Sequence, residues 1–260
     1  ALMGIGPLLP WRRAEQQRLT HNLAWLTGAF VVAGGLAWLL GVRKVYPALT
    51  VGLAGYNLMS LGLLLAGALV PRLRLAKRSA FAVLRSYAHE SRRRFGSMIV
   101  HFGVVVIAVG VAFSAGYRVD QQIRIDFGES AEFDGYTLTA VDRFVERTPQ
   151  RISSGAVIEV SRDGRPVRTM TPRLNVFGDS RAVPTPAVMY RPSHDLYLNL
   201  NSTVGPTTTF VVLRVVKSPL VTWIWIGGFI LVIGTAYALG GSTRTVPARA
   251  TVRAEERAQA

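Results

Sequence analysis

The side chains that could carry chemistry in this chain are few, and its histidines stand out among them. The sequence has 260 residues, with four histidines and no cysteine. Without cysteine, the chain cannot form disulfides, zinc–thiolate sites, iron–sulfur clusters, thiol nucleophiles or a covalent c-type haem linkage of its own. Neither a Gly-x-Ser-x-Gly nor a His-Glu-x-x-His motif occurs. The sequence therefore predicts no catalytic residue, and the remaining chemistry to consider is ligand binding by histidine.

His101 lies in an otherwise apolar stretch, residues 95–110. An ionisable side chain inside a membrane span is costly, so such a residue is a functional hypothesis by default. On a helix, Ala108 and Ala112 share the face of His101, and their small side chains leave room beside the ring. A neutral imidazole in an apolar pocket suits the axial position of haem iron. The alternative is a packing histidine bonded to a neighbouring helix, and the residues alone leave both open.

The other three histidines have simpler predicted roles. His21 begins an apolar stretch and is expected at a membrane interface, whereas His89 lies in a basic segment and is expected to be solvated. His194 is followed by Asp195 in a polar segment. We predict that this pair lies on the surface in contact with solvent, with a binding role for His194 as the alternative.

Four apolar stretches must position these side chains. Half of the residues are hydrophobic and only 17% are charged, and a bilayer-spanning helix needs about 20 apolar residues. The sequence predicts four transmembrane helices, over residues 21–41, 46–70, 97–117 and 219–239. Along the third, Gly96, Gly103 and Gly110 form a stripe away from His101, which would let a neighbouring helix approach closely.

The formal net charge of +15 is unevenly distributed, and its distribution predicts the topology. Residues 71–96 hold eight basic residues and one acidic residue. By the positive-inside rule this basic loop is cytoplasmic, together with residues 1–20 and 240–260. Arg43 and Lys44 do not fit this assignment, because they would lie in a short turn on the opposite side of the membrane. The basic residues flank the spans without interleaved aromatic residues, which favours contact with lipid headgroups and predicts no nucleic-acid partner.

Residues 118–216 are polar and show the period-two alternation of β-strands, for example at Ile123, Ile125 and Phe127. Asp163-Gly164 stands between two such runs, which predicts a hairpin with a primed turn. The expected fold class is therefore an α-helical membrane protein with four transmembrane helices and an inserted all-β domain, a small sandwich or open barrel. The titratable residues of this domain are scattered, so we expect it to dock partners.

Several motifs, in order along nearly the whole chain, resemble the C-terminal part of the CcmF family, the membrane proteins of bacterial cytochrome c maturation that form part of the haem lyase. The nitrite-reductase-specific paralogue is similar as well. The matching stretches are GIGPLLPWR (4–12), RFGSMIVHFG (94–103), QQIRI (121–125), GYTL (135–138), DLY (195–197) and SPLVTWIWIGG (218–228).

The resemblance implies that His101 is one axial ligand, through iron, of a permanently bound haem b. It also implies a bacterial inner membrane location with the β-domain in the periplasm. The family's second axial ligand, its WWD segment and the two periplasmic histidines beside that segment have no counterpart here, and the surroundings of His194 match neither histidine. Since the chain also begins at Ala1, we expect a naturally split protein or a piece of a longer one, which is not active as an enzyme without the missing N-terminal CcmF-like part.

Two hypotheses of different class follow. In the first, the chain is the C-terminal portion of a membrane haem lyase subunit that binds a b-type haem and helps attach haem to apocytochrome c. Its partners would be other cytochrome c maturation proteins, namely a haem chaperone and apocytochrome-handling subunits. In the second, the chain is a non-catalytic membrane scaffold whose β-domain docks assembly partners. Iron bound at His101 distinguishes the two.

Overall fold

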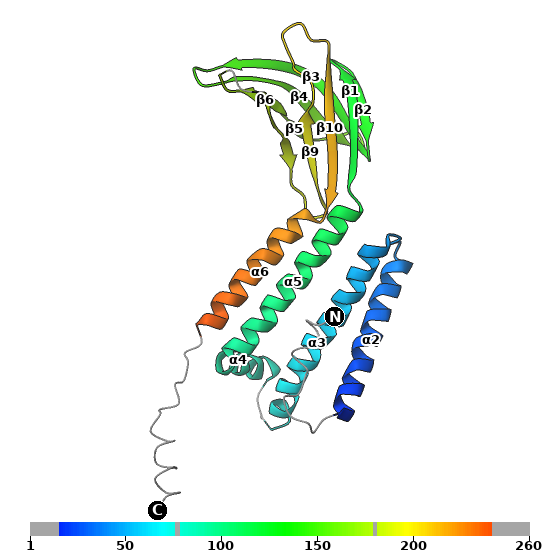
Figure 1. The fold of residues 1–260 in the computed structure, drawn as a ribbon, viewed down its shortest axis with the longest axis vertical. Coiled ribbons are helices and arrows are strands. Elements are labelled where there is room, and N and C mark those ends of the chain that lie inside the picture. Colours follow the sequence, from blue (N-terminus) through cyan, green and yellow to red (C-terminus); the bar gives the residue numbers. More distant parts are fainter. Residues whose placement is uncertain (1–15, 76–78, 179–180, 241–260) are drawn as a thin grey trace, which may run out of the picture.

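The computed structural model describes residues 16–75, 79–178 and 181–240. The expected terminal segments 1–20 and 240–260 therefore lie outside the described residues, apart from 16–20 and Gly240, and so does the motif at 4–12. Within the described residues four helices are long and apolar enough to cross a membrane. They are α2 (Gln16–Leu39), α3 (Val45–Leu75), α5 (Arg92–Gly116) and α6 (Val221–Leu239). A β-domain stands at one end of these helices (Figure 1), so the predicted fold class is confirmed.

Helices α5 and α6 pack closely because glycines face each other across their interface. A Cβ atom placed on Gly103 would lie 2.8 Å from the carbonyl oxygen of Gly227. One placed on Gly96 would lie 2.7 Å from the carbonyl oxygen of Gly234. Backbone at these positions cannot move aside for a side chain, so only glycine permits this approach. The stripe at residues 96, 103 and 110 is thus confirmed as a packing face, and its partner is α6.

The basic segment at residues 71–96, expected as a loop, is instead largely helical. Helix α3 continues to Leu75, and a separate helix, α4 (Ala80–Glu90), lies between α3 and α5 in the chain. The hydroxyl of Ser79 accepts a hydrogen bond from the Ala82 amide and caps the start of α4. Val83 and Tyr87, one turn apart, are buried. This apolar i, i+4 pair explains why the segment folds as a helix against the spans.

The turn between α2 and α3 holds Arg43 and Lys44 at the end of the spans nearer the β-domain (Figure 1). Aromatic rings accommodate both cations. The Arg43 guanidinium lies 5.1 Å from the ring centre of Trp38, and the Lys44 ammonium 5.4 Å from that of Tyr117. The Lys44 amide also donates to the Tyr117 hydroxyl at 3.2 Å. These cation–π contacts stabilise two positive charges at the end of the spans where the positive-inside rule expects few.

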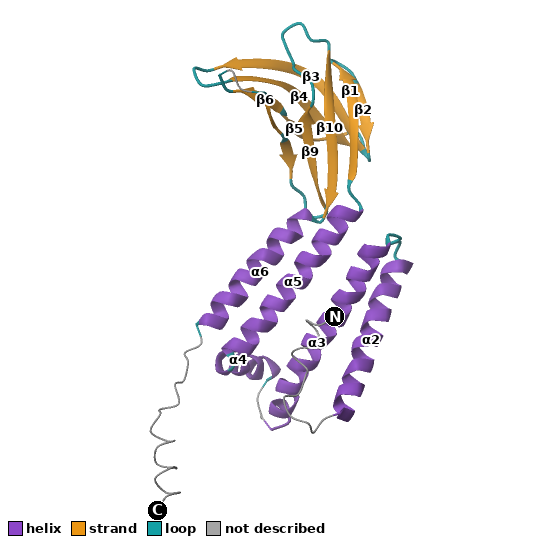
Figure 2. Cartoon of the chain, viewed as in Figure 1, coloured by secondary structure: helices purple, strands orange, loops and turns teal. Residues whose placement is uncertain are grey.

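The inserted domain is an open, antiparallel half-barrel of two sheets (Figure 2). One sheet has the order β1-β10-β9-β8, and the other has β2-β3-β4-β6-β7, with β5 also paired to β4. Alternate residues of the strands face inward and form the core, as the period-two pattern predicts. The described strands are β1 (Val119–Asp126), β2 (Ser130–Phe133), β3 (Tyr136–Arg147), β4 (Ile152–Arg162), β5 (Arg165–Met170), β6 (Arg173–Val176), β7 (Val183–Thr185), β8 (Ala187–Met189), β9 (His194–Leu200) and β10 (Phe210–Pro219).

The β4–β5 hairpin turns at Asp163 and Gly164, whose φ angles are 51° and 73°. Two successive positive φ values are typical of a type I′ turn, so the predicted hairpin is confirmed.

The β-domain connects to the last span through a single residue. Strand β10 ends at Pro219 and α6 begins at Val221, and Leu220 between them has a φ of 57°. The fourth span thus follows directly from the sheet, without a linker.

Candidate functional site

His101 lies on α5, on the side away from α6. It is two residues from Gly103, which places it about 200° round the helix from the packing stripe. Its Nδ1 atom lies 2.8 Å from the backbone oxygen of Ser97 and 3.5 Å from the Ser97 hydroxyl. A carbonyl oxygen can only accept, so Nδ1 carries a proton, and in the neutral tautomer with this bond Nε2 is the nitrogen with the lone pair. The ring is therefore anchored within its own helix and presents Nε2 outward.

A groove of about 490 Å³ lies between α3 and α5. It begins one turn beyond His101 on the same face of α5, at Val104 and Val105, and it continues along Ala108 and Ala112. The small alanine side chains make the groove, as the sequence predicts. From α3 the groove is lined by Thr50, Leu53, Ala54 and Asn57.

The two polar side chains of this groove are already engaged. The Thr50 hydroxyl donates to the Tyr46 oxygen, and the Asn57 amide donates to the Leu53 oxygen, each at 2.8 Å within α3. The surface beside His101 is therefore mainly apolar. The groove therefore offers apolar contact to a planar group bound beside the imidazole.

The prediction that His194 and Asp195 form a solvated surface pair is wrong. Their exposed fractions are 6% and 1%. The Nε2 atom of His194 lies 2.7 Å from the Tyr136 hydroxyl, and its Nδ1 atom 2.9 Å from the Ser193 hydroxyl. A usable signal was present, because the inward positions 196, 198 and 200 of β9 extend back to 194 in steps of two.

Burial lowers the pKa of His194 below its ordinary value, and the nearby cations Lys217, Arg162 and Arg191 lower it further. Both effects disfavour the charged form of the ring. His194 is therefore neutral at pH 7, and both of its nitrogens have hydrogen-bond partners. It is a structural residue of the domain core, in a different part of the molecule from His101.

Asp195 joins the β-domain to the last span. Its Oδ1 atom accepts from the Thr222 hydroxyl of α6 at 3.3 Å and from the Arg191 amide at 3.4 Å. Beside it, the indole of Trp223 donates to the Pro192 oxygen at 2.9 Å. These contacts explain why a carboxylate is buried at the base of the sheet, since it holds the first turn of α6 in place.

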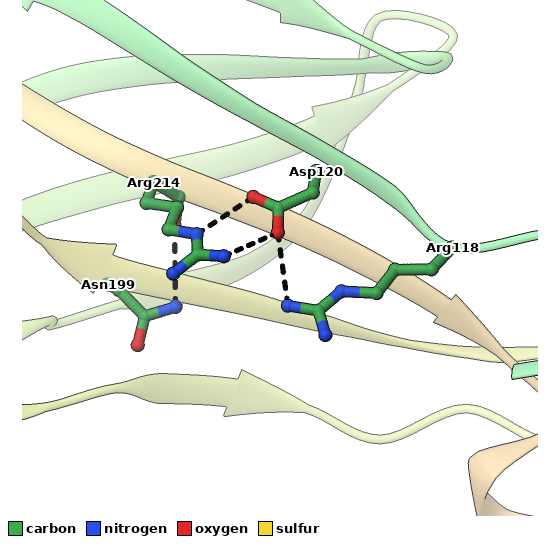
Figure 3. A network of polar contacts seen from close by, with 4 residues as sticks. All are labelled: Arg118, Asp120, Asn199 and Arg214. Atoms are coloured by element: carbon green, nitrogen blue, oxygen red, sulfur yellow. Dashed lines mark hydrogen bonds and ion pairs between the residues drawn. The ribbon is translucent and has the colours of Figure 1, made fainter. Parts of the chain in front are cut away.

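The outer face of the four-stranded sheet carries an ion-pair cluster that the sequence analysis missed (Figure 3). Asp120 accepts from the Nε and Nη2 atoms of Arg214 at 2.9 and 2.7 Å, and from Arg118 at 3.1 Å. The hydrogen bonds from Arg214 are the main reason why the pKa of Asp120 lies below its ordinary value. Both oxygens of the carboxylate are engaged, so the cluster joins β1 to β10.

The four histidines are not brought together. His21 lies at the start of α2, where its Nε2 atom accepts from the Trp25 indole at 3.0 Å. His89 is exposed on α4. Over residues 16–75, 79–178 and 181–240, no group of three or more histidine, aspartate or glutamate residues is arranged to hold a metal ion. His101 therefore does not belong to a three-residue ligand group of these types within the described chain.

The helices and the half-barrel together define a multi-pass membrane protein with a β-domain inserted between its last two spans. No family model matches the chain. Over 235 residues it is 28% identical to the cytochrome c-type biogenesis protein CcmF of Haemophilus influenzae, which covers 90% of this chain and 35% of that protein. The Escherichia coli CcmF is also 28% identical, over 90% of this chain and 34% of its own length.

A solved structure named cytochrome c heme lyase CcmF superposes with a TM-score of 0.69 at 27% identity, over 92% of this chain and 38% of the other. The chain corresponds to the C-terminal part of CcmF, and the resemblance inferred from the motifs is confirmed. It spans about a third of the length of the curated relatives it matches. The probable cytochrome c-type biogenesis protein NrfE of Escherichia coli is less similar, with 22% identity over 58% of the chain.

Proposed function

We propose that this chain acts in the maturation of c-type cytochromes, as the C-terminal portion of a CcmF-type haem lyase subunit, and that His101 is an axial ligand of a b-type haem. The observation that carries the proposal is the state of the imidazole. Its Nδ1 proton is bound to the Ser97 oxygen at 2.8 Å, so that in the neutral tautomer Nε2 is the nitrogen that can bind iron. The similarity to cytochrome c-type biogenesis proteins supports the biological setting.

The donor set fits a haem better than a bare metal ion. The described residues offer no group of three or more histidine, aspartate or glutamate side chains, whereas protein sites for zinc, calcium or magnesium usually use several such ligands. A porphyrin occupies four equatorial positions of iron and leaves only axial positions for histidine. Among the described residues both hydrogen-bond partners of His101 belong to Ser97 on the same helix. This argues against a packing histidine that bonds to a neighbouring helix.

The residues around His101 have separate tasks in this proposal. The Ser97 carbonyl fixes the tautomer and orientation of the ring and increases the basicity of Nε2. Val104 and Val105 exclude water from the ligand side, while Ala108 and Ala112 keep the groove wide enough for a flat group. The haem, when bound, supplies reversible one-electron chemistry at its iron. His101 lies closer to Arg92 than to Gly116 along α5, so the ligand position is nearer the basic end of the span.

We further propose that the protein lies in the bacterial inner membrane with the β-domain in the periplasm. Arg92, Arg93 and Arg94 lie at the end of α5 opposite the β-domain (Figure 1), which the positive-inside rule assigns to the cytoplasm. The β-domain would dock other cytochrome c maturation proteins, such as a haem chaperone and apocytochrome-handling subunits, with apocytochrome c as substrate. The remaining CcmF-like part would supply the second axial ligand.

Replacing His101 with alanine in the complete protein tests the proposal. We expect the α and β bands of the reduced haem to disappear and cytochrome maturation to stop, while the protein still inserts into the membrane. Added imidazole should restore part of the spectrum by occupying the vacated ligand position. His89→Ala is the matched control, because His89 is exposed on α4; His194 is unsuitable because it is buried in the β-domain. If the bands keep full intensity without His101, the scaffold hypothesis replaces this one.

A further inference from the structure

On one side of the half-barrel, the two sheets are separated by an opening between the edges of β5 and β8, which do not pair with each other. Within the described chain, β5 pairs only with β4, and β8 pairs only with β9. A cavity of about 410 Å³ lies at this opening, lined by residues of β5, β6, β7 and β8. We call it the seam cavity and define it by Arg151, Arg168, Arg173, Asn175 and Thr185.

Three arginines from three separate segments meet at the seam cavity. Arg151 precedes β4, Arg168 lies on β5 and Arg173 begins β6. Among the described residues none of the three forms an ion pair, whereas Arg118, Arg124 and Arg214 in the other sheet each do. The guanidinium of Arg173 is held over the Phe144 ring at 5.5 Å and donates to the Thr171 hydroxyl at 3.4 Å. A guanidinium has five N–H donors, so most of its donor capacity remains.

A chain of polar side chains leads from the domain interior to the cavity and ends in a donor. The Ser153 hydroxyl donates to Asn175 Oδ1, and Asn175 Nδ2 donates to the Thr185 hydroxyl, both at 2.7 Å. Asn175 is only 6% exposed, so its orientation is fixed by these bonds. The Thr185 oxygen accepts from Asn175, which leaves the hydroxyl proton of this exposed residue free for a ligand. No acidic residue is among the described residues that line the cavity. The site therefore favours a ligand that is an acceptor and carries negative charge.

Basic and acidic residues are also separated along the sequence of the β-domain. Residues 147–191 contain eight arginines and three acidic residues, whereas residues 118–146 contain three arginines and seven acidic residues. The basic half includes all strands that line the cavity. An acidic partner would be attracted to this half and repelled by the other, which fixes its orientation during approach.

The edge strands indicate how such a partner would be held. Pro184 lies within β7 and Pro186 directly before β8. Proline lacks an amide hydrogen and discourages the addition of a further strand. Recognition would therefore come from side chains, by paired guanidinium–carboxylate hydrogen bonds. Three guanidiniums from separate segments suit several carboxylates in succession better than one small anion.

We propose that the seam cavity is the docking site for an acidic peptide segment of an assembly partner, whose carboxylates pair with Arg151, Arg168 and Arg173. The proposal rests on the docking role proposed for the β-domain and does not depend on haem at His101.

Fluorescence in a single-cysteine chain tests this proposal. The sequence contains no cysteine, so Thr169→Cys gives one labelling site at the cavity. The labelled chain, in nanodiscs of zwitterionic lipid, is titrated with a short poly-glutamate peptide and with poly-glutamine of equal length. We expect a saturable change with poly-glutamate only. Arg151→Gln, Arg168→Gln and Arg173→Gln together should weaken binding by about tenfold or more.

Arg147→Gln, Arg162→Gln and Arg165→Gln together are the matched control, because they remove the same charge from exposed positions outside the cavity. This control should weaken binding by less than about threefold. Equal weakening by the two triple variants would mean unspecific charge attraction and would overturn the proposal, as would saturation by inorganic phosphate without a response to the peptide. Arg168→Gln alone affects an exposed side chain and should weaken binding without loss of fold. His101→Ala should leave the signal unchanged, which separates this test from that of the haem.

Discussion

At the scale of single residues, two histidines show how hydrogen bonding decides what an imidazole can do. His101 uses one nitrogen within its own helix and leaves the other free. His194 has partners at both nitrogens, Tyr136 and Ser193, and is buried among them. The first arrangement presents a ligand, whereas the second holds a strand in place. The sequence around His194 does not reveal these partners, because Tyr136 lies 58 positions away.

The neutral state of His194 predicts that the β-domain loses stability in mild acid. Its pKa is lowered in the folded domain, first by burial and then by Lys217 and Arg162. Between the folded pKa and the unfolded value of about 6.5, the unfolded chain binds more protons, so the free energy of unfolding rises with pH. This stability is complete above about pH 6.5, declines as the pH falls towards the lower folded pKa, and does not change further beneath it.

Thermal unfolding of the purified chain, followed by circular dichroism in the β-sheet region, measures this effect. Between about pH 7.5 and pH 5 the unfolding temperature should fall more in the native chain than in His194→Gln, which cannot titrate in this range. Parallel pH profiles of the two proteins would show that His194 does not titrate on unfolding.

At the scale of elements, the α5–α6 pair depends on backbone contact and tolerates almost no added volume. The contact is reciprocal, since a Cβ on Gly227 would lie 2.8 Å from the Gly103 oxygen and one on Gly103 would lie 2.8 Å from the Gly227 oxygen. This interface carries the β-domain, because β1 follows α5 and β10 leads into α6. The base of the domain is thus fixed by the spacing of two helices.

Gly227→Ala and Gly228→Ala provide a matched test on adjacent positions of α6. Nothing lies within 4 Å of a Cβ on Gly228, whereas a Cβ on Gly227 meets the backbone of α5 at 2.8 Å. Gly227→Ala should destabilise the chain in detergent by about 1–3 kcal/mol, the usual cost of overpacking, because the helices must move apart. Gly228→Ala should melt at the native temperature. If both variants unfolded at the same temperature as the native chain, close packing at this interface would be contradicted.

At the scale of the whole molecule, the membrane spans separate a basic end from the β-domain. Helix α4 and the start of α5 lie at one end, and the half-barrel at the other (Figure 1). In our proposals the spans hold a cofactor and the β-domain holds partners.

Single cysteines test this arrangement in cells. Arg165→Cys is exposed next to the β4–β5 turn and His89→Cys is exposed on α4. The chain has no other cysteine. A membrane-impermeant maleimide should label the first in intact spheroplasts and the second only after the membrane is opened. Labelling of both in intact spheroplasts would contradict the four-span topology.

The sequence by itself determined the features that depend on local patterns. Apolar length gave the four spans, period-two alternation the strands, and Asp163-Gly164 the type I′ hairpin, because each depends on residues a few positions apart. The glycine stripe of α5 and the face shared by His101 and Ala108 were also readable, since helical geometry fixes them within one element. The motifs around His101 were sufficient to indicate the relationship to CcmF.

Only the tertiary structure decided which distant residues meet. The burial of His194 and Asp195 depends on Tyr136 from β3 and Thr222 from α6. The groove beside His101 needs the facing side of α3, and the seam cavity needs arginines from three separate segments. Contacts of this kind arise from how sheets close and helices cross, and no single stretch of sequence encodes them.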